Sequence, residues 1–180
     1  MRPLTEDETK ILFQKLSIYI GGNLMSLIDC EDETYVFRLH KERVFYMSES
    51  IAKAASLVPK KSLLSMGVCL GKFTKSKKFR LGITALQHLA RLTTNKVWVK
   101  AGGEQSYIYG NHVIKRHIGR MTDGLSNNMG VIICSMDETP LGFGVLAKSS
   151  SEVKTADAEN IIVYHQTDIG EYLREEVDLI

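Results

Sequence analysis

Cysteine and proline are scarce in this sequence, with three of each among 180 residues. The cysteines, Cys30, Cys69 and Cys134, are an odd number and lie far apart among apolar neighbours. We therefore expect reduced, partly buried thiols of an intracellular protein, because disulfide frameworks belong to oxidising compartments. The five histidines show no metal-ligand spacing with these cysteines, so we expect no metal site.

Long apolar runs are missing as well. No run approaches the roughly 20 residues that a membrane span needs. The first eight residues, MRPLTEDE, are charged from the start, unlike a secretory signal. A hydrophobic fraction of 44% is ordinary for a folded soluble protein. We expect no membrane contact, and either one ordinary domain or two small ones.

The motifs of common enzyme classes are also absent. Gly21-Gly22 follow a helical pattern and lack the Lys-Ser/Thr partner of a phosphate-binding loop. The sequence has no Gly-x-Ser-x-Gly motif and no clustered Cys/His pair. We therefore expect no catalytic residue, no cofactor and no enzymatic activity.

The last absence concerns acidic residues, none of which occurs between Glu49 and Glu104. Eleven cations lie in that interval: Lys53, Lys60, Lys61, Lys72, Lys75, Lys77, Lys78, Arg80, Arg91, Lys96 and Lys100. Such a stretch favours a polyanionic partner, unless acids from elsewhere in the fold neutralise it. Residues 1–94 carry 15 Lys/Arg against 9 Asp/Glu, a balance of +6, whereas residues 95–180 carry 8 against 12, a balance of −4.

The first half of the chain predicts an α+β domain with an antiparallel sheet. Thr5 and Glu8 form a capping box for a helix that ends at Gly21-Gly22. The alternation over residues 34–39 and 43–47 predicts a β-hairpin. Further elements follow in order: a short helix through residue 57, strands over 63–73 and 79–83 flanking a basic turn, and a helix capped by Thr84. We end this domain near Thr94, giving residues 1–94.

The second half, residues 95–180, predicts mainly strands. Residues 104–109 are predicted to form a short helix that ends before Gly110, because glycine adopts a positive φ at little energetic cost. We expect strands at 97–99 and near 113–121, 131–136, 141–148 and 161–165, then a last helix with a capping box at Asp168–Glu171. No linker separates the halves, so we expect the two domains to pack directly against each other.

Two motifs in this half resemble a PUA domain, a small β-barrel module that docks on structured RNA. Gly110, Val113 and Ile118 fit the motif at the start of a strand, and Gly142-Phe143-Gly144 fits the later strand. Arg116-His117 stand where most PUA domains have Pro-Gly. The resemblance implies a PUA-like β-barrel over residues 95–180 and RNA as its ligand.

The whole chain is similar to a family of two-domain PUA proteins of 60S ribosomal-subunit biogenesis, the Nip-seven family. Five segments carry this similarity: residues 1–9, 19–24, 71–81, 109–115 and 140–144. It implies a factor of the nucleus and nucleolus that binds pre-rRNA and other pre-60S assembly factors. We expect a monomer, and single-stranded or uridine-rich segments of the RNA as its ligand. Such a protein supports processing of large-subunit rRNA precursors without catalysing it.

We predict two sets of RNA-binding residues. The first is a basic hairpin whose lysines suit phosphates rather than base edges: Lys72, Lys75, Lys77, Lys78 and Arg80. The alternative is that this hairpin is only a solvated, lysine-rich turn, whose charges serve solubility and not RNA binding. The second set lies where PUA domains commonly touch RNA: Lys100, Tyr107, Lys115, Arg116, His117 and Arg120. A core position is favoured for at least one of Tyr107 and Tyr109, because their helix must bury a face.

Two other functions compete with RNA binding. The acidic second half is compatible with a protein–protein adaptor whose PUA-like domain has lost RNA binding. A cryptic RNA-modifying enzyme is disfavoured, because the catalytic domains that accompany PUA domains are considerably larger than 94 residues.

Overall fold

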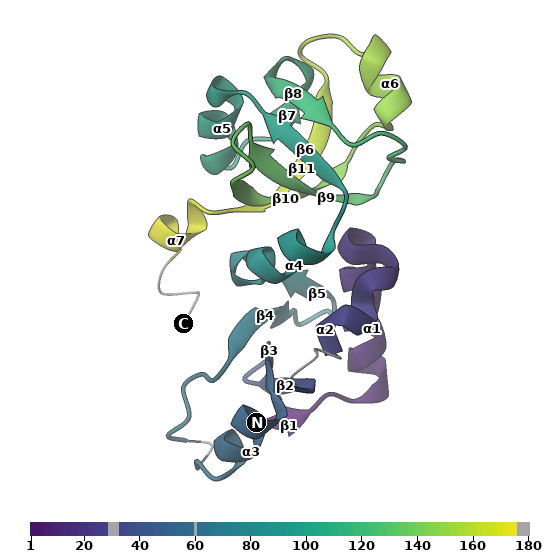
Figure 1. Cartoon of the computed structure of the whole chain (residues 1–180). Helices are drawn as coiled ribbons and strands as arrows, with labels where there is room; N and C mark the ends of the chain where they lie inside the picture. Colours follow the sequence, from purple (N-terminus) through teal and green to yellow (C-terminus); the bar gives the residue numbers. More distant parts are fainter. Residues whose placement is uncertain (29–32, 60, 176–180) are drawn as a thin grey trace.

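The computed structural model describes residues 1–28, 33–59 and 61–175, arranged as two units stacked along one long axis (Figure 1). Each unit has its own sheet. The first contains five strands in the order β1-β2-β3-β4-β5, and the second contains six in the order β7-β11-β10-β9-β6-β8. The structure is therefore an α+β fold, as predicted. Cys30 lies outside the described residues, whereas Cys69 and Cys134 are free thiols.

The sheet of the first unit is antiparallel throughout. Its strands are β1 (Arg2–Pro3), β2 (Tyr35–His40), β3 (Arg43–Ser48), β4 (Val68–Phe73) and β5 (Phe79–Leu81). Its helices are α1 (Glu6–Ile20), η1 (Gly21–Leu24), α2 (Met25–Ile28), α3 (Glu49–Ser56), η2 (Ile83–Ala85) and α4 (Leu86–Leu92). The predicted hairpin is present as β2 and β3, which pair from Tyr35 with Ser48 to His40 with Arg43.

Helix α1 begins at the predicted capping box. The Thr5 hydroxyl accepts from the Glu8 N–H at 3.3 Å, and the Glu8 carboxylate accepts from the Thr5 N–H at 2.9 Å. The Arg2 guanidinium forms a bidentate ion pair with the same carboxylate, with N–O distances of 2.8 and 2.6 Å. This arrangement attaches the edge strand β1 to the first turn of α1.

Two predictions for the first unit are wrong in detail. The strand expected from residue 63 begins only at Val68. Thr84 does not cap the following helix, because its hydroxyl donates to the Cys69 carbonyl on β4. The chain therefore makes the turn η2 before α4 begins, with Ala85 at the N-cap position. A contact between elements has replaced the local cap.

The sheet of the second unit curls into a near-barrel (Figure 1). Its strands are β6 (Lys96–Val99), β7 (Val113–Ile114), β8 (Ile118–Met121), β9 (Gly130–Ser135), β10 (Pro140–Leu146) and β11 (Ile161–Asp168). Its helices are α5 (Ala101–Ile108), η3 (Lys115–His117), α6 (Ser150–Thr155) and α7 (Glu171–Arg174). Strand β6 pairs with β9 in parallel, and the other neighbours are antiparallel.

Helix α5 begins three residues before the predicted start at Glu104, and three larger differences separate this unit from the prediction. The single strand expected near 113–121 is broken by η3 into β7 and β8. Helix α7 has no side-chain cap, because the Asp168 carboxylate accepts from Gly170 N–H and from Arg174 instead. Helix α6 was not predicted, although Ser149 and Glu152 form a complete capping box at its start.

The two units pack directly, as predicted, through one shared hydrophobic core. Leu16, Tyr19 and Leu89 from the first unit belong to the same buried cluster as Ile132 and Phe143 from the second. The Tyr19 ring meets the Phe143 ring edge to face, with centroids 5.1 Å apart.

The helical stretch Glu6–Ile28 corrects the prediction that no apolar stretch approaches the length of a membrane span. Among the described residues it is the one stretch long and apolar enough to cross a membrane by length and composition. In the fold it spans α1, η1 and α2, and its residues Leu12, Leu16 and Tyr19 are buried. Its apolar side therefore packs as the side of a core helix.

The start of α1 should respond to pH. The hydrogen bonds from Arg2 lower the pKa of Glu8 to about 2. Glu8 thus stabilises the fold above its unfolded-state pKa of about 4.3, and this contribution is lost as the pH falls through the folded-state value. We expect Glu8→Gln to lower the unfolding free energy by about 1 kcal/mol at pH 7. The difference from wild type should shrink as the pH falls below about 4.

Urea unfolding at several pH values measures this effect. Glu6→Gln is the matched control, because Glu6 lies in the same first turn and is exposed. Equal losses in the two variants at pH 7 would contradict the role given to the capping box.

Candidate nucleic-acid interface

The basic hairpin is formed by β4, β5 and the turn between them. Lys72 on β4 lies opposite Arg80 on β5 and also opposite Arg43 on β3. Residues directly opposite each other in antiparallel strands share one face, with Cβ atoms about 5 Å apart. The sheet therefore aligns three cations, Arg43, Lys72 and Arg80, which we call the cation row.

The turn of this hairpin is held by Thr74. Its N–H donates to the Lys78 carbonyl at 2.8 Å, and its hydroxyl accepts from the Lys78 N–H at 3.2 Å. Lys77 donates its N–H to the Thr74 carbonyl and adopts a φ of 58°. The side chains of Lys75, Lys77 and Lys78 are exposed.

All five predicted hairpin cations are exposed: Lys72, Lys75, Lys77, Lys78 and Arg80. None of them forms an ion pair with an acid in the part of the chain that the structure describes. Like charges placed opposite each other in a sheet are destabilising. The cation row therefore has a repulsion that an external anion would relieve.

The second predicted set, which we call the PUA edge, comprises Lys100, Tyr107, Lys115, Arg116, His117 and Arg120. It differs from the basic hairpin, because most of its cations have partners within the chain. Arg116 forms an ion pair with Glu159 at 2.6 Å. Arg120 forms one with Glu138, and its guanidinium also lies 4.0 Å from the centre of the Trp98 ring. Lys115 is half-buried and donates to the Val153 carbonyl. These cations are already largely neutralised or engaged.

Lys100 and His117 complete this edge. Lys100 is exposed, and its N–H donates to the His117 carbonyl at 2.8 Å. His117 is half-buried, and its burial, with the neighbouring Arg116 charge, lowers the pKa of its imidazole. His117 is therefore mostly neutral at pH 7 and adds no charge to the edge.

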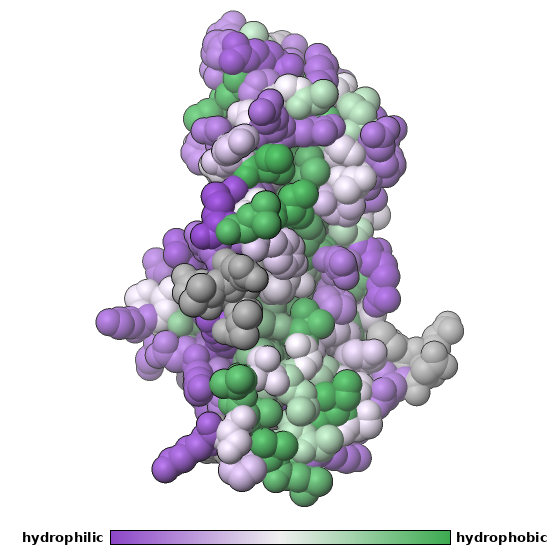
Figure 2. Space-filling view, turned by 90° about the vertical axis from the view of Figure 1, so that its left-hand side faces the viewer, coloured by the Kyte–Doolittle hydropathy of each residue, from purple (hydrophilic) through white to green (hydrophobic). Residues whose placement is uncertain are grey.

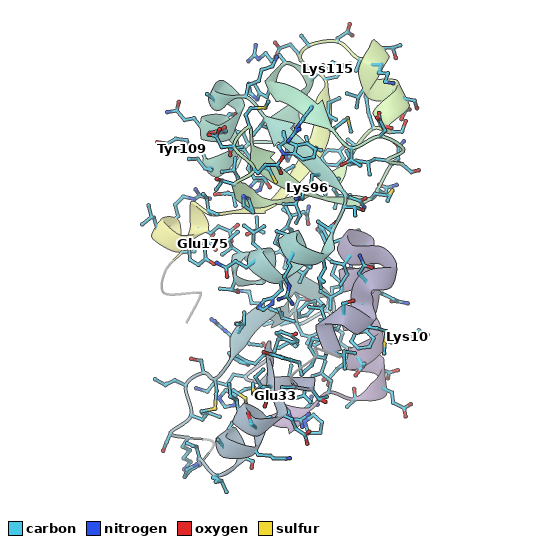
Figure 3. All side chains as sticks on the ribbon, viewed as in Figure 1. Lys10, Glu33, Lys96, Tyr109, Lys115 and Glu175 are labelled. Carbon is cyan, nitrogen blue, oxygen red and sulfur yellow. The ribbon has the colours of Figure 1, made fainter. Side chains whose placement is uncertain are left out.

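Tyr107 does not take the stacking position predicted for it. Its side chain is 1% exposed, and its hydroxyl donates to the carbonyls of Phe143 and Thr167 at 2.9 and 3.0 Å. The prediction of Tyr107 as an RNA-stacking residue is wrong, because helix α5 buries this face against β10 and β11. Tyr109 is the exposed tyrosine, at 71%, and it points away from the unit in Figure 3.

A cleft of about 360 Å³ lies between the two units. The first unit contributes the cation row and Lys15 of α1 to its walls, and the second contributes residues of β11 and the segment after it. Figure 3 shows Glu175, which lines the cleft, at the junction of the units, whereas Lys115 lies toward the far end of the second unit. The predicted PUA edge and the cleft are thus separate surfaces.

Sequence reasoning missed the cleft residues Lys15, Arg43, His165 and Gln166. A signal existed for Arg43 alone, because a correct strand register would have placed it beside Lys72. Among the described residues, no group of three or more His, Cys, Asp or Glu is arranged to hold a metal ion.

Two family models match the chain. The model of the NIP7/UPF0113 pre-PUA domain matches residues 1–83, and that of the UPF0113 PUA domain matches residues 95–177. The chain is 54% identical to the 60S ribosome subunit biogenesis protein NIP7 homolog of Tetraodon nigroviridis, over 99% of both chains. It is 52% identical to the 60S ribosome subunit biogenesis protein nip7 of Schizosaccharomyces pombe, over 98% of both chains.

Solved structures agree on the fold. A PUA domain protein from Aeropyrum pernix superposes with a TM-score of 0.63, covering 99% of this chain and 90% of that chain at 16% identity. A protein from Pyrococcus horikoshii superposes with a TM-score of 0.61 over 97% of this chain and 98% of that chain at 15% identity. Fold and sequence together define a two-domain PUA protein.

Within that class, the chain belongs to the NIP7 family, because the two models and the full-length relatives agree on it. The resemblance in the sequence is confirmed.

The ion pair of Arg116 generates a prediction. We expect Arg116→Gln to weaken RNA binding by less than about threefold, because the Glu159 carboxylate beside the guanidinium offsets most of its attraction for a phosphate. Glu159→Gln frees the guanidinium and should tighten binding slightly. Fluorescence anisotropy with a labelled single-stranded RNA measures both. A tenfold loss for Arg116→Gln would show that Arg116 reads the RNA despite Glu159.

The Pro-Gly pair common in PUA domains is a poor replacement for Arg116-His117 here. The Arg116 N–H donates to the Ala158 carbonyl at 3.0 Å, and proline has no N–H to donate. The single substitutions above leave that backbone bond intact.

Proposed function

We propose that this protein is a non-catalytic assembly factor of pre-60S ribosomal particles, which binds pre-rRNA and other assembly factors in the nucleolus. The exposed basic hairpin without acidic partners among the described residues carries the RNA-binding part of this proposal. The full-length relatives, which are named as 60S biogenesis proteins, support the assembly role. We place the domain boundary between Thr94 and Asn95, and we expect a monomer.

The basic hairpin is the main RNA contact in this proposal. Lysines on a turn offer point charges to phosphates, which carry no sequence information. The hairpin would therefore accept single-stranded pre-rRNA, including uridine-rich segments, with modest sequence preference. Lys100, Lys115, Arg116, His117 and Arg120 remain a second, weaker contact, because most of them are engaged within the chain.

An apolar surface supports the protein-binding part of the proposal. Leu173 on α7 is 90% exposed, and Arg174 connects α7 to the end of α5 by donating to the Ile108 carbonyl. Tyr109 lies directly after that point. Figure 2, which views the molecule from the side of α7, shows hydrophobic surface at this level. In this proposal a protein partner covers this apolar surface and RNA contacts the basic hairpin, so an adaptor role and RNA binding are compatible.

RNA binding should depend strongly on salt. If about three to six phosphates are neutralised, the logarithm of the affinity should fall with the logarithm of salt concentration with a slope of roughly −2 to −5. A flat response would favour the adaptor that has lost RNA binding.

The protein should not modify RNA. Incubation with RNA and S-adenosylmethionine should leave the RNA chemically unchanged, and a modified base would contradict the non-catalytic role.

Charge reversal on the turn is the direct test of the hairpin. We expect Lys75→Glu with Lys78→Glu to weaken binding at least tenfold and about equally for different RNA sequences, because several charge-assisted contacts are lost. The control is Lys10→Glu with Lys154→Glu, two exposed lysines on α1 and α6. Equal losses in both pairs would mean that only the net charge matters.

A further inference from the structure

The cleft between the units has two chemically different walls. The cations that line it, Lys15, Arg43, Lys72 and Arg80, all belong to the first unit. The acids that line it, Glu171 and Glu175, belong to the second unit, beside Gln166 of β11. The cleft is therefore polarised across the junction, with four formal positive charges facing two negative ones.

The cation row is a built feature of the sheet. Gly71 precedes Lys72 with a φ of 153°, and an added Cβ there would collide with the Arg80 carbonyl oxygen. The glycine permits the close approach of β4 to β5 that places Lys72 beside Arg80. Three like charges in a row oppose folding, so their position at the cleft points to an anionic ligand.

The floor of the cleft supplies another polar group without a partner. Tyr19 is 1% exposed and lines the cleft, and its hydroxyl has no hydrogen-bond partner within the described residues. Buried polar atoms are normally paired. The hydroxyl is therefore a buried polar group at the cleft whose hydrogen-bonding capacity is unused among the described residues.

We propose that the cleft holds one nucleotide of a bound RNA strand, with its phosphate on the cation row and its sugar and base against the second unit. The opposite wall suits this orientation. Carboxylates repel a phosphate, but they accept hydrogen bonds from a ribose hydroxyl or from a base N–H. The Gln166 amide offers both a donor and an acceptor. The volume of about 360 Å³ lies within the range of about 300–1,000 Å³ usual for small-ligand sites.

The exposed turn favours a strand over a free nucleotide. Lys75, Lys77 and Lys78 continue the positive charge of the same hairpin beyond the cleft. A free nucleotide would leave these three lysines unmatched, whereas a strand that leaves the cleft would carry its next phosphates over them. This inference rests on the RNA-binding function proposed above and assigns a particular nucleotide position within it.

The test compares two pairs of substitutions on one hairpin. Lys72→Gln with Arg80→Gln removes two charges from the cleft, and Lys75→Gln with Lys78→Gln removes two from the turn. Binding of a single-stranded oligouridine is measured by anisotropy at constant salt. We expect the cleft pair to lose roughly tenfold more affinity than the turn pair, because its contacts are geometrically fixed as well as charged.

Photo-crosslinking locates the base directly. The same oligouridine carrying 4-thiouridine, whose reactive atom is on the base, should crosslink wild-type protein within β11, at His165 to Thr167. At saturating RNA, the crosslink should persist in the turn pair and be lost in the cleft pair. The cleft pair should unfold at or above the wild-type temperature, because it removes repulsion between like charges opposite each other in the sheet, and the exposed turn pair should unfold close to it.

The outcomes separate the cleft from the proposed function. No RNA binding by wild-type protein at low salt would overturn both. Binding with equal losses in the two pairs and no crosslink in β11 would overturn only the cleft. Uridine monophosphate and inorganic phosphate are titrated against the bound RNA. If the free nucleotide occupies the cleft while the RNA stays bound and β11 stays uncrosslinked, the cleft is a mononucleotide site and the strand assignment is wrong.

Discussion

The contact of Tyr19 with the second unit is the constraint on which the rest of the molecule depends. The Tyr19 ring packs on Phe143, and the absence of a side chain at Gly130 makes room for it. Its backbone is held as well, because Thr93 donates its hydroxyl to the Tyr19 carbonyl at 2.6 Å. The residue that connects the domains is thus fixed at both its ring and its backbone. Burial of such an aromatic side chain stabilises by about 2–3 kcal/mol.

This shared core determines which surfaces face each other. With α1 docked on β9 and β10, the face of the first sheet that carries the cation row is directed toward the end of β11. Neither domain alone would form the cleft. The position of a nucleotide there would depend on both domains, and a substitution that loosens the Tyr19 contact should weaken RNA binding without removing a charge.

The sequence predicted those elements whose cause is local. The capping box at Thr5 and Glu8, the hairpin of β2 and β3 and the positive-φ Gly110 just after the C-cap of α5 all follow from residues a few positions apart. The failures have a different cause. Thr84 bonds to Cys69 fifteen residues earlier, and Tyr107 donates to carbonyls 36 and 60 residues later. A residue pattern contains no information about such partners. The basic hairpin was found because its charge is contiguous in sequence, whereas the cleft requires strand register and domain packing.

The two domains differ in how many of their cations form ion pairs within the chain. This contrast argues that the two domains contribute differently to RNA binding. In the second domain, Arg116 and Arg120 lie within ion pairs to Glu159 and Glu138, so a net negative unit has few free cations. In the first domain, Glu8 and Glu49 pair with Arg2 and Lys53, and Glu42, whose carbonyl accepts from the Phe73 N–H at the end of β4, forms no ion pair with the hairpin among the described residues. The hairpin beside the cleft therefore carries five exposed cations that have no ion pair among the described residues. A PUA domain of this kind would contribute less by attracting RNA than by forming the polar wall against which a nucleotide is positioned.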